Sequence, residues 1–336
     1  MLRYLENVDL SRMNTFGIRC RTRRLIQCDE EKELIQWLAV NDMKGEIMIL
    51  GQGSNILFTR DYPGTIIQYT GQGFTASFND PGHVIVDVRG GTVWDHLVEA
   101  CVNNGWGGIE NLSLIPGLTG AAPVQNIGAY GCEVKDVIDE VRALSLENGE
   151  HFFFDNKACR FGYRDSIFKT TYRNKLLITS VKLKLSTSPL FNTSYGNLQT
   201  ELAKTGPPSL KNIRQAVINT RRNKLPDPHV LGNAGSFFKN PVVPKSQADE
   251  LLRSYPGMPV YPCGVERQKL SAAWLIDTCG WKGKKMGDAG VHEKQALVIV
   301  NYGNATGTDI LTLAETISKS VFEQFGVRLE REVTVV

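Results

Sequence analysis

The sequence predicts an α+β protein built from three regions, and three observations support this. The chain has 336 residues, which is more than one hydrophobic core normally holds. Helix-type and strand-type apolar patterns alternate up to residue 105, and strand-type patterns dominate after residue 131. The segment GPPSLKN, at residues 206–212, is typical of a linker between regions.

The first third of the chain alternates helices and strands. It predicts strands at 46–50 and 83–89 and helices at 30–42 and 93–103. Asp29 should cap the first helix, whose Leu34, Trp37 and Leu38 lie on one side. Gly105 should stop the second helix.

The remainder of the chain is first rich in strands and then mixed. It predicts strands at 141–146, 151–154, 176–186 and 296–301 and helices at 246–255 and 270–280. A long C-terminal helix follows, ended by Gly326, with an apolar stripe formed by Ile310, Leu313, Ile317, Val321 and Phe325. Residues 327–336 should form a closing strand.

The composition is that of an ordinary globular protein, with 42% hydrophobic and 22% charged residues. No apolar run approaches the roughly 18 residues that a membrane helix needs. The N-terminal segment contains acidic residues and no apolar core, so it does not resemble a secretory signal. We therefore expect a cytoplasmic protein that does not associate with membranes.

Basic residues cluster at 19–24 and at 221–224, although the formal net charge is only +3. Neither cluster alternates with aromatic residues, so we expect no nucleic-acid partner. A positive pocket for a phosphorylated small molecule fits them at least as well. The seven cysteines form no CxxC pair and no ligand pattern with the five histidines, so we expect buried, reduced thiols and no metal site.

The segment LGQGSN begins like a dinucleotide-binding fingerprint, which is G-x-G-x-x-G between a strand and a helix. It fails that test because Ile56 replaces the third glycine and a turn follows instead of a helix. Glycine backbones can approach a pyrophosphate closely, and neighbouring polar side chains add donors. A non-Rossmann phosphate cradle formed by Gly51, Gly53, Ser54 and Asn55 and a tight turn without a ligand are equally consistent with the pattern.

Residues 105–131 are rich in glycine and show neither a helical nor a strand period. So long an irregular stretch inside a compact domain is usually functional. Gln125, Asn126 and Tyr130 offer directed hydrogen bonds, and apolar side chains such as Ile115 are interleaved with them. We expect the segment to pack against a large apolar ligand such as an isoalloxazine ring; the alternative is a wide surface loop between domains.

Three further residues have both a functional and an ordinary interpretation. Arg164 can bind a carboxylate through two hydrogen bonds, but it can equally pair with Asp165 or be solvated. Ser236 lies in a pattern that is not the G-x-S-x-G of hydrolases, so it is either a turn residue or a proton donor. Glu332 lies on the polar side of the last predicted strand, where a solvated residue is the default interpretation.

Together, nine segments resemble the UDP-N-acetylenolpyruvoylglucosamine reductase family of peptidoglycan synthesis. They follow the family's order, and FNTSYGNL at 191–198 is similar to the tyrosine-bearing insertion of its longer type. The segments are NTFGI (14–18), LGQGSNILF (50–58), LIPGLTGAAPVQNIGAYG (114–131), FGYRDSIFK (161–169), KLPDP (224–228), NAGSFFKNP (233–241), WLID (274–277), GDAGVHEKQALVIVN (287–301) and LEREV (329–333).

The resemblance implies an α+β fold of three domains. Two of them form a FAD-binding fold of the vanillyl-alcohol-oxidase (PCMH) type, and the third is a C-terminal substrate-binding α/β domain. On this chain the first FAD-binding subdomain corresponds to 1–67 with 309–336, the second to 68–208, and the substrate-binding domain to 218–308. We expect a monomer.

The resemblance also implies the reaction, which is the NADPH-dependent reduction of UDP-N-acetyl-3-O-(1-carboxyvinyl)-glucosamine to UDP-N-acetylmuramate through non-covalent FAD. Hydride passes from flavin N5 to C3 of the enolpyruvyl group, and a serine protonates C2. The matching catalytic residues are Arg164, Ser236 and Glu332. The matching substrate contacts are Tyr195, Lys224, Asn240 and Gln295, with Arg221 adding charge nearby. The matching FAD contacts are Gly51, Gly53, Ser54, Asn55, Ile115, Pro116, Gly117, Gly120, Ala121, Ala122, Gln125, Asn126, Ile127, Gly128 and Tyr130.

The chain departs from the family at Thr334, where related sequences often carry arginine, and at Ala121–Ala122, where some carry hydroxyl residues near the flavin phosphates. Two other interpretations stay open. One is a flavin oxidase of the same fold, which the absence of histidine from 51–55 and 105–131 disfavours. The other is a non-catalytic nucleotide-binding or RNA-binding protein.

Overall fold

The computed structural model describes residues 1–41, 45–196 and 198–336, and its contacts divide the chain into two compact units, each with its own β-sheets. Unit 1 comprises Met1–Val8, Thr22–Gln52 and Pro63–Asn223. Unit 2 comprises Asp9–Arg21, Gly53–Tyr62 and Lys224–Val336. Within the described residues, no helix is both long and apolar enough to cross a membrane.

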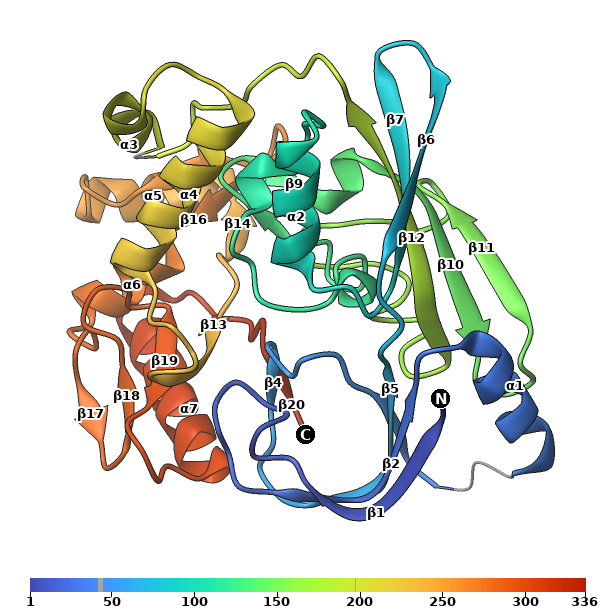
Figure 1. Ribbon diagram of the computed structural model, residues 1–336. Coiled ribbons are helices and arrows are strands. Elements are labelled where there is room, and N and C mark those ends of the chain that lie inside the picture. Colours follow the sequence, from blue (N-terminus) through green and yellow to red (C-terminus); the bar gives the residue numbers. More distant parts are fainter. Residues whose placement is uncertain (42–44, 197) are drawn as a thin grey trace. The chain divides into compact units, whose positions relative to one another are not determined.

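The first sheet of unit 1 has the strand order β1-β2-β5-β3 (Figure 1). Its strands are β1 (Arg3–Asp9), β2 (Arg21–Cys28), β5 (Tyr62–Tyr69) and β3 (Ile47–Ile49). Helix α1 (Glu31–Val40) packs against this sheet because its buried Leu34 joins Ile26 and Ile67 in one apolar cluster. Strand β3 ends two residues before Gly51, so the predicted strand that leads into the glycine pair is confirmed.

The second sheet of unit 1 is antiparallel, with the order β11-β10-β12-β7-β6 (Figure 1). Its strands are β11 (His151–Asp155), β10 (Ile138–Ser145), β12 (Leu176–Ser186), β7 (His83–Arg89) and β6 (Phe74–Asp80). Helix α2 (Trp94–Asn103) packs Leu97, Val98 and Cys101 into the same core as Val86 and Val181 of the sheet. The predicted strands and the predicted helix at 93–103 are confirmed.

Between α2 and β10 the chain is largely irregular, as predicted, with only short elements. These are 3₁₀ helices at Glu110–Leu112, Thr119–Ala121 and Val134–Asp136 and the strands β8 (Gly128–Ala129) and β9 (Cys132–Glu133). After β12 come α3 (Leu198–Thr205) and α4 (Leu210–Lys224). The predicted linker at 206–212 is therefore wrong in extent, because α4 already begins at Leu210 and buries Ile213 and Val217 beside α3.

One detail of the predicted elements in unit 1 is also wrong. Asp29 does not cap α1: the capping position is Glu30, whose side chain makes no cap bond, and Asp29 accepts a hydrogen bond from the amino group of Met1. The last residue of the predicted helix, Asp42, lies outside the described residues. Strand β12 buries both faces from Leu176 to Val181, because it is the central strand of its sheet.

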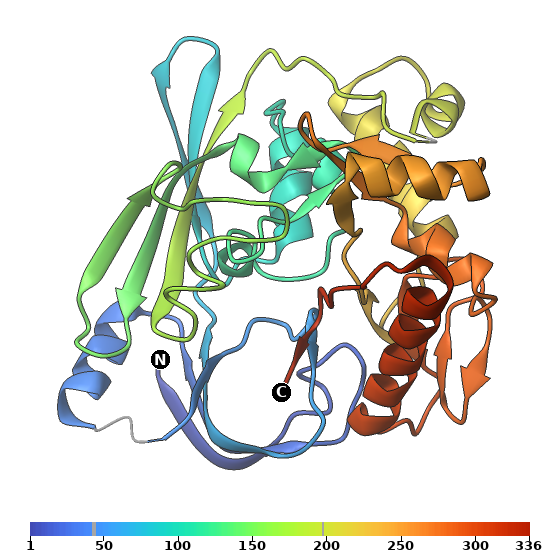
Figure 2. The ribbon, with the colours of Figure 1, turned by 180° about the vertical axis from the view of Figure 1, so that it is seen from behind.

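Unit 2 contains a four-stranded sheet, a three-stranded sheet and a two-stranded pair, with the orders β13-β19-β18-β17, β14-β16-β15 and β20-β4. Most of this unit is drawn in orange and red in Figure 2. Its strands are β4 (Ile56–Leu57), β13 (Gly232–Ser236), β14 (Val242–Pro244), β15 (Val260–Pro262), β16 (Arg267–Leu270), β17 (Lys285–Met286), β18 (Ala289–Val291), β19 (Val298–Asn301) and β20 (Thr334–Val335). Its helices are α5 (Lys245–Ser254), α6 (Ala272–Thr278) and α7 (Gly307–Phe325).

Helix α7 confirms the predicted C-terminal helix. The stripe from Ile310 to Phe325 is buried, a capping box joins Thr306 and Asp309, and Gly326 ends the helix with φ +64°. The predicted closing strand is shorter than expected, since only Thr334–Val335 pairs, in parallel with β4.

The predicted three-domain boundaries stay a prediction. Strand β20 pairs with β4 of the N-terminal segment. Helix α7 packs on β18, β19 and α6. Helix α4 is continuous across residue 218, the expected start of the substrate-binding domain.

Candidate active site

Two of the glycine-rich segments lie side by side in unit 1. The Gln52 side-chain oxygen accepts a hydrogen bond from the backbone N–H of Gly117 at 3.1 Å. Gln68 donates from its side chain to the Gly51 carbonyl at 2.7 Å. A Cβ added to Gly51 would lie 3.7 Å from the Cβ of Ala121. The fold thus joins two segments that are more than sixty residues apart in the sequence.

Packing alone explains two of the predicted glycines. A Cβ at Gly53 would lie 2.1 Å from the Met13 carbonyl oxygen, and one at Gly120 would lie 2.9 Å from the Ile178 carbonyl oxygen. Gly53 also has φ +65°. These two positions require glycine whether or not a ligand binds.

The backbone donors beside them suit an anionic ligand. Within the described residues, no acceptor takes a hydrogen bond from the N–H of Gly51 or of Gln52. Buried or half-buried N–H groups of a turn are the donors that pyrophosphate prefers in protein cradles. Ile115 and Val124 flank this region and pack partly against the core of unit 1. The donor set and its apolar surroundings fit FAD.

Asn126 shapes the loop from inside. It is fully buried with φ +46°. Its side-chain nitrogen donates to the Gly162 carbonyl at 2.9 Å, and its side-chain oxygen accepts from Lys135 N–H at 3.1 Å. The side chain is therefore used within the protein, and the backbone is used as well, since the Asn126 N–H donates to the Pro123 carbonyl at 3.3 Å.

Arg164 is held by the same loop. Its guanidinium donates to the Gly128 carbonyl at 2.7 Å and to the Asn126 carbonyl at 3.4 Å, and it lies 5.5 Å from the centre of the Tyr163 ring. Asp165, the neighbour considered for an ion pair, accepts from the backbone N–H of Ser166. Arg164 also has φ +54°, an uncommon conformation for a residue with a side chain.

Arg221, Tyr130 and Tyr195 form a second group beside this loop. Arg221 donates to the Leu114 carbonyl at 3.2 Å. The rings of Tyr130 and Tyr195 meet edge to face with centres 6.2 Å apart. Burial raises the pKa of the Tyr130 phenol, and the charge of Arg221 acts against that rise. Burial lowers the pKa of Arg221, and the nearby charge of Arg164 adds to the effect. Positive charge from two arginines thus accumulates beside the irregular loop of unit 1.

Ser236 and Glu332 are brought together in unit 2. Ser236 ends β13, and the backbone N–H of Glu332 donates to the Phe237 carbonyl at 2.8 Å. The pairing continues with a bridge between Phe238 and Arg331. Asn55 donates from its side chain to the Glu332 carbonyl at 3.2 Å. The C-terminal segment therefore runs beside the serine-bearing strand, although nearly a hundred residues separate them in the sequence.

Two of the remaining predicted substrate contacts, Asn240 and Gln295, form hydrogen bonds within unit 2. The Asn240 side-chain oxygen accepts from Ala272 N–H at the start of α6, at 3.0 Å. The Gln295 side-chain oxygen accepts from Leu297 N–H at 3.4 Å. Lys224 is the exposed last residue of α4. Neither of these hydrogen bonds joins one of the three residues to another.

Comparisons with known proteins match both units. An FAD binding domain model matches residues 22–154, and a model of the C-terminal domain of UDP-N-acetylenolpyruvoylglucosamine reductase matches residues 227–336. The UDP-N-acetylenolpyruvoylglucosamine reductase of Chromobacterium violaceum is 47% identical over 335 residues, covering 98% of each chain. The chain belongs to the UDP-N-acetylenolpyruvoylglucosamine reductase family. The enzyme of the same name from Pseudomonas aeruginosa is 44% identical and covers 97% of each chain.

A solved structure agrees with this family. The crystal structure of UDP-N-acetylenolpyruvylglucosamine reductase from Thermus caldophilus is similar with a TM-score of 0.69 at 26% identity, and the match covers 100% of this chain and 99% of that one. The predicted fold class, a FAD-binding fold joined to a family-specific C-terminal domain, is confirmed. The protein is an oxidoreductase of this reductase family with a FAD-binding domain.

The sequence reasoning missed an ion pair next to the site. Asp95, in the first turn of α2, binds the guanidinium of Arg214 through both oxygens, at 2.6 and 3.0 Å. Its first oxygen also accepts from Leu114 N–H at 2.5 Å. No spacing rule joins residues 119 positions apart in the sequence, so a single sequence offers no signal for this contact.

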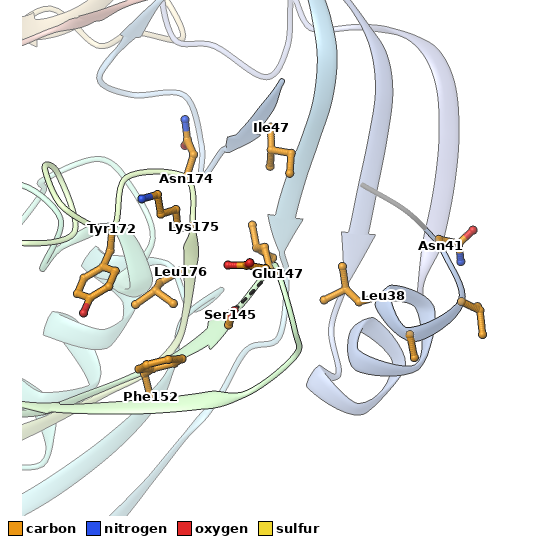
Figure 3. Close-up of a pocket in the computed structure, with 13 residues that line it drawn as sticks. Leu38, Asn41, Ile47, Ser145, Glu147, Phe152, Tyr172, Asn174, Lys175 and Leu176 are labelled. Carbon is orange, nitrogen blue, oxygen red and sulfur yellow. Dashed lines mark hydrogen bonds between the residues drawn. The ribbon is translucent and has the colours of Figure 1, made fainter. Parts of the chain in front are cut away.

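One cavity of unit 1 lies apart from all of these residues. It has a volume of about 750 Å³ and is lined by residues such as Leu38, Ile47, Phe152 and Tyr172 (Figure 3). None of the predicted catalytic, FAD-binding or substrate-binding residues lines it. This cavity therefore does not support the predicted site, which is supported by the hydrogen bonds of its residues and by the family.

Proposed function

We propose that the protein reduces the enolpyruvyl group of UDP-N-acetyl-3-O-(1-carboxyvinyl)-glucosamine, forming UDP-N-acetylmuramate for peptidoglycan precursor synthesis. NADPH is the electron donor and FAD is bound without a covalent link. One observation supports this most strongly: a FAD-binding match and a reductase-specific match fall on the two units that carry the two sets of predicted site residues.

When bound, FAD supplies hydride-transfer chemistry between NADPH and the vinyl carbon C3. In this proposal the N–H groups of Gly51 and Gln52 bind its pyrophosphate, because neither N–H donates a hydrogen bond to any residue that the structure describes. The segment 115–122 and residues Gln125, Ile127 and Gly128 cover the remainder of the cofactor, and Ser54 and Asn55 extend the cradle.

Arg164 binds the carboxylate of the substrate. Hydride addition at C3 leaves negative charge on C2 and on the adjoining carboxylate, so a fixed guanidinium lowers the energy of that state. Its two carbonyl contacts with Gly128 and Asn126 hold it in place before the substrate arrives. A donor that is already oriented needs no reorganisation during the reaction.

Ser236 donates the proton to C2. Its hydroxyl keeps its proton at neutral pH, and no residue in the described part of the chain forms a hydrogen bond with it. Glu332 assists from the adjoining segment; it must be protonated or hydrogen-bonded so that it does not repel the developing charge. Backbone pairing at Phe237 keeps the two residues adjacent.

The substrate's UDP part is assigned to Tyr195, Arg221, Lys224, Asn240 and Gln295. Tyr195 is 47% exposed in a loop next to Tyr130, so it is accessible to a ligand. Its neighbour Asn197 lies outside the described residues. We further propose a cytoplasmic monomer that binds no nucleic acid, and the three-domain division given by the family.

The decisive test is a visible spectrum of the purified protein taken in three steps. We expect flavin absorbance that NADPH bleaches under anaerobic conditions and that the UDP-enolpyruvyl sugar then restores. Restoration by oxygen but not by the sugar would show an oxidase of the same fold. A protein that stays colourless after FAD is added would support the nucleotide-binding alternative.

A further inference from the structure

Helix α2 holds the segment 114–117 at both of its ends. The carboxylate of Asp95 accepts from Leu114 N–H at 2.5 Å. The backbone N–H of Trp94 donates to the Gly117 carbonyl at 3.0 Å. Two consecutive residues in the first turn of one helix thus bracket the four residues that contain the proposed flavin contacts Ile115, Pro116 and Gly117.

The turn at Leu114 needs such a restraint. Leu114 has φ +58°, a left-handed conformation that is unfavourable for a residue with a side chain. Its N–H is bound by Asp95, and its carbonyl accepts from Arg221 at 3.2 Å. Both polar groups of the strained residue are therefore held, each by a charged side chain from a different helix.

The same carboxylate also fixes helix α4. Arg214 is 9% exposed, and its guanidinium meets both oxygens of Asp95. Arg221 follows Arg214 by seven residues, which is about two helical turns, so both side chains leave the same face of α4. The ion pair therefore fixes the position and rotation of helix α4. This in turn determines how Arg221 reaches Leu114 and the neighbourhood of Tyr130.

We propose that Asp95 is a positioning residue, which aligns the flavin-side segment 115–117 through Leu114 and the substrate-side Arg221 through Arg214. This inference rests on the proposed function, because it assigns a purpose to the two groups that Asp95 orients. Asp95 itself touches neither cofactor nor substrate in this proposal.

The key variant is Asp95→Asn. The amide oxygen can still accept a hydrogen bond from the Leu114 N–H. The amide nitrogen is a donor, so it cannot accept the second hydrogen bond from the Arg214 guanidinium. We expect the FAD dissociation constant of the apoprotein to rise about tenfold and the visible circular dichroism of bound flavin to change. In the FAD-saturated enzyme, we expect KM for the UDP-sugar to rise about tenfold while kcat changes less than threefold.

Glu99→Gln is the matched control. Glu99 lies on the same helix and approaches Arg214 at 3.8 Å, but it is 60% exposed and, among the described residues, it forms no hydrogen bond with Leu114. This variant removes the same charge beside the same arginine. We expect its FAD affinity, flavin spectrum and KM to equal those of the unmodified protein.

Two outcomes overturn the proposal. Asp95→Asn could lower thermal stability yet leave the FAD dissociation constant, the flavin dichroism and KM unchanged, which would show a purely structural ion pair. Equal effects of Asp95→Asn and Glu99→Gln would show that charge rather than position matters.

If Asp95→Asn does not fold, Arg214→Lys replaces it. Lysine keeps the positive charge but loses the bidentate contact with Asp95. We expect the same changes in FAD affinity, flavin dichroism and KM, each about threefold. Failure of the unmodified protein to turn over the UDP-sugar would refute the proposed function instead, and the FAD titration would still test Asp95.

Discussion

The two units hold their predicted site residues in different ways. In unit 1, Leu114, Asn126, Tyr130 and Arg164 all have positive φ without being glycine, and hydrogen bonds to and from side chains keep them there. In the described part of unit 2, no residue other than glycine has positive φ, and Ser236 and Glu332 are presented by backbone pairing. Strained backbone persists only where its surroundings over-determine it, so unit 1 should be the more sensitive to conservative change.

This difference predicts how substitutions in the two units will behave. A side chain on a paired strand can be removed without moving its neighbours. Removing a side chain that makes several loop contacts also moves the residues it contacts. Substitutions in unit 2 should therefore separate chemistry from structure, whereas those in unit 1 should affect both.

The largest effect is expected for Ser236→Ala in unit 2. Loss of the proton donor should slow the reoxidation of flavin by the UDP-sugar by about 10²–10⁴-fold. The rate of flavin reduction by NADPH should stay within about twofold, because backbone pairing keeps the strand in place. Stopped-flow absorbance measures both half-reactions, and an equal fall in the two would refute the proton-donor role.

Arg164→Lys in unit 1 should come next. Lysine keeps the charge but cannot contact both the Gly128 and Asn126 carbonyls while facing a carboxylate. We expect the same half-reaction to slow by roughly 10²–10³-fold. Unlike the serine variant, this one should also change the flavin spectrum, since the loop loses a contact. An unchanged rate would remove Arg164 from the site.

Gly128→Ala disturbs the loop without replacing a functional side chain. A Cβ there would lie 3.0 Å from a guanidinium nitrogen of Arg164, from the Cys132 carbonyl oxygen and from the Glu133 Cγ, so these neighbours, including the arginine, must shift. We expect the sugar half-reaction to slow by roughly 10-fold, because small displacements of a catalytic group are costly. Gly257→Ala in unit 2 is the control, since nothing lies within 4 Å of its added Cβ. Equal behaviour of the two alanine variants would show that the loop tolerates displacement.

The smallest effect concerns acid stability. Burial alone would raise the pKa of Asp95, but hydrogen bonds from Arg214 and Leu114 lower it below its usual value. The stability it contributes is therefore present above about pH 4 and is lost as the pH falls through the lowered folded pKa. Urea unfolding across this range should show a flatter pH dependence for Asp95→Asn.

Asp309 of unit 2 provides the comparison for that measurement. The hydrogen bonds of Thr306 lower the pKa of Asp309 too, but Asp309 is an exposed residue in the first turn of α7, where it completes the capping box. Asp309→Asn should flatten the pH dependence less than Asp95→Asn does. A larger effect of Asp309→Asn would contradict the view that the buried ion pair dominates.

Local patterns in the sequence were sufficient for most of the fold. The α7 stripe, the strand before Gly51 and the stop of α2 after Asn103 follow from periodicity and from capping residues, which act over a few residues. The cap of α1 was predicted at Asp29 and is wrong because a distant group, the amino group of Met1, takes that carboxylate. Errors arose where a long-range contact competed with a local preference.

By itself, the sequence determined the class of fold, the irregular loop at 105–131, the non-Rossmann nature of the GxG turn and, by resemblance, the family. Only the tertiary structure decided that Gln52 reaches Gly117, that Glu332 lies beside Phe237, and that Asp95 joins Leu114 to Arg214. The reason is physical. Periodicity and capping are set by neighbouring residues along the chain, whereas these contacts depend on which distant segments the packed core brings within hydrogen-bond range.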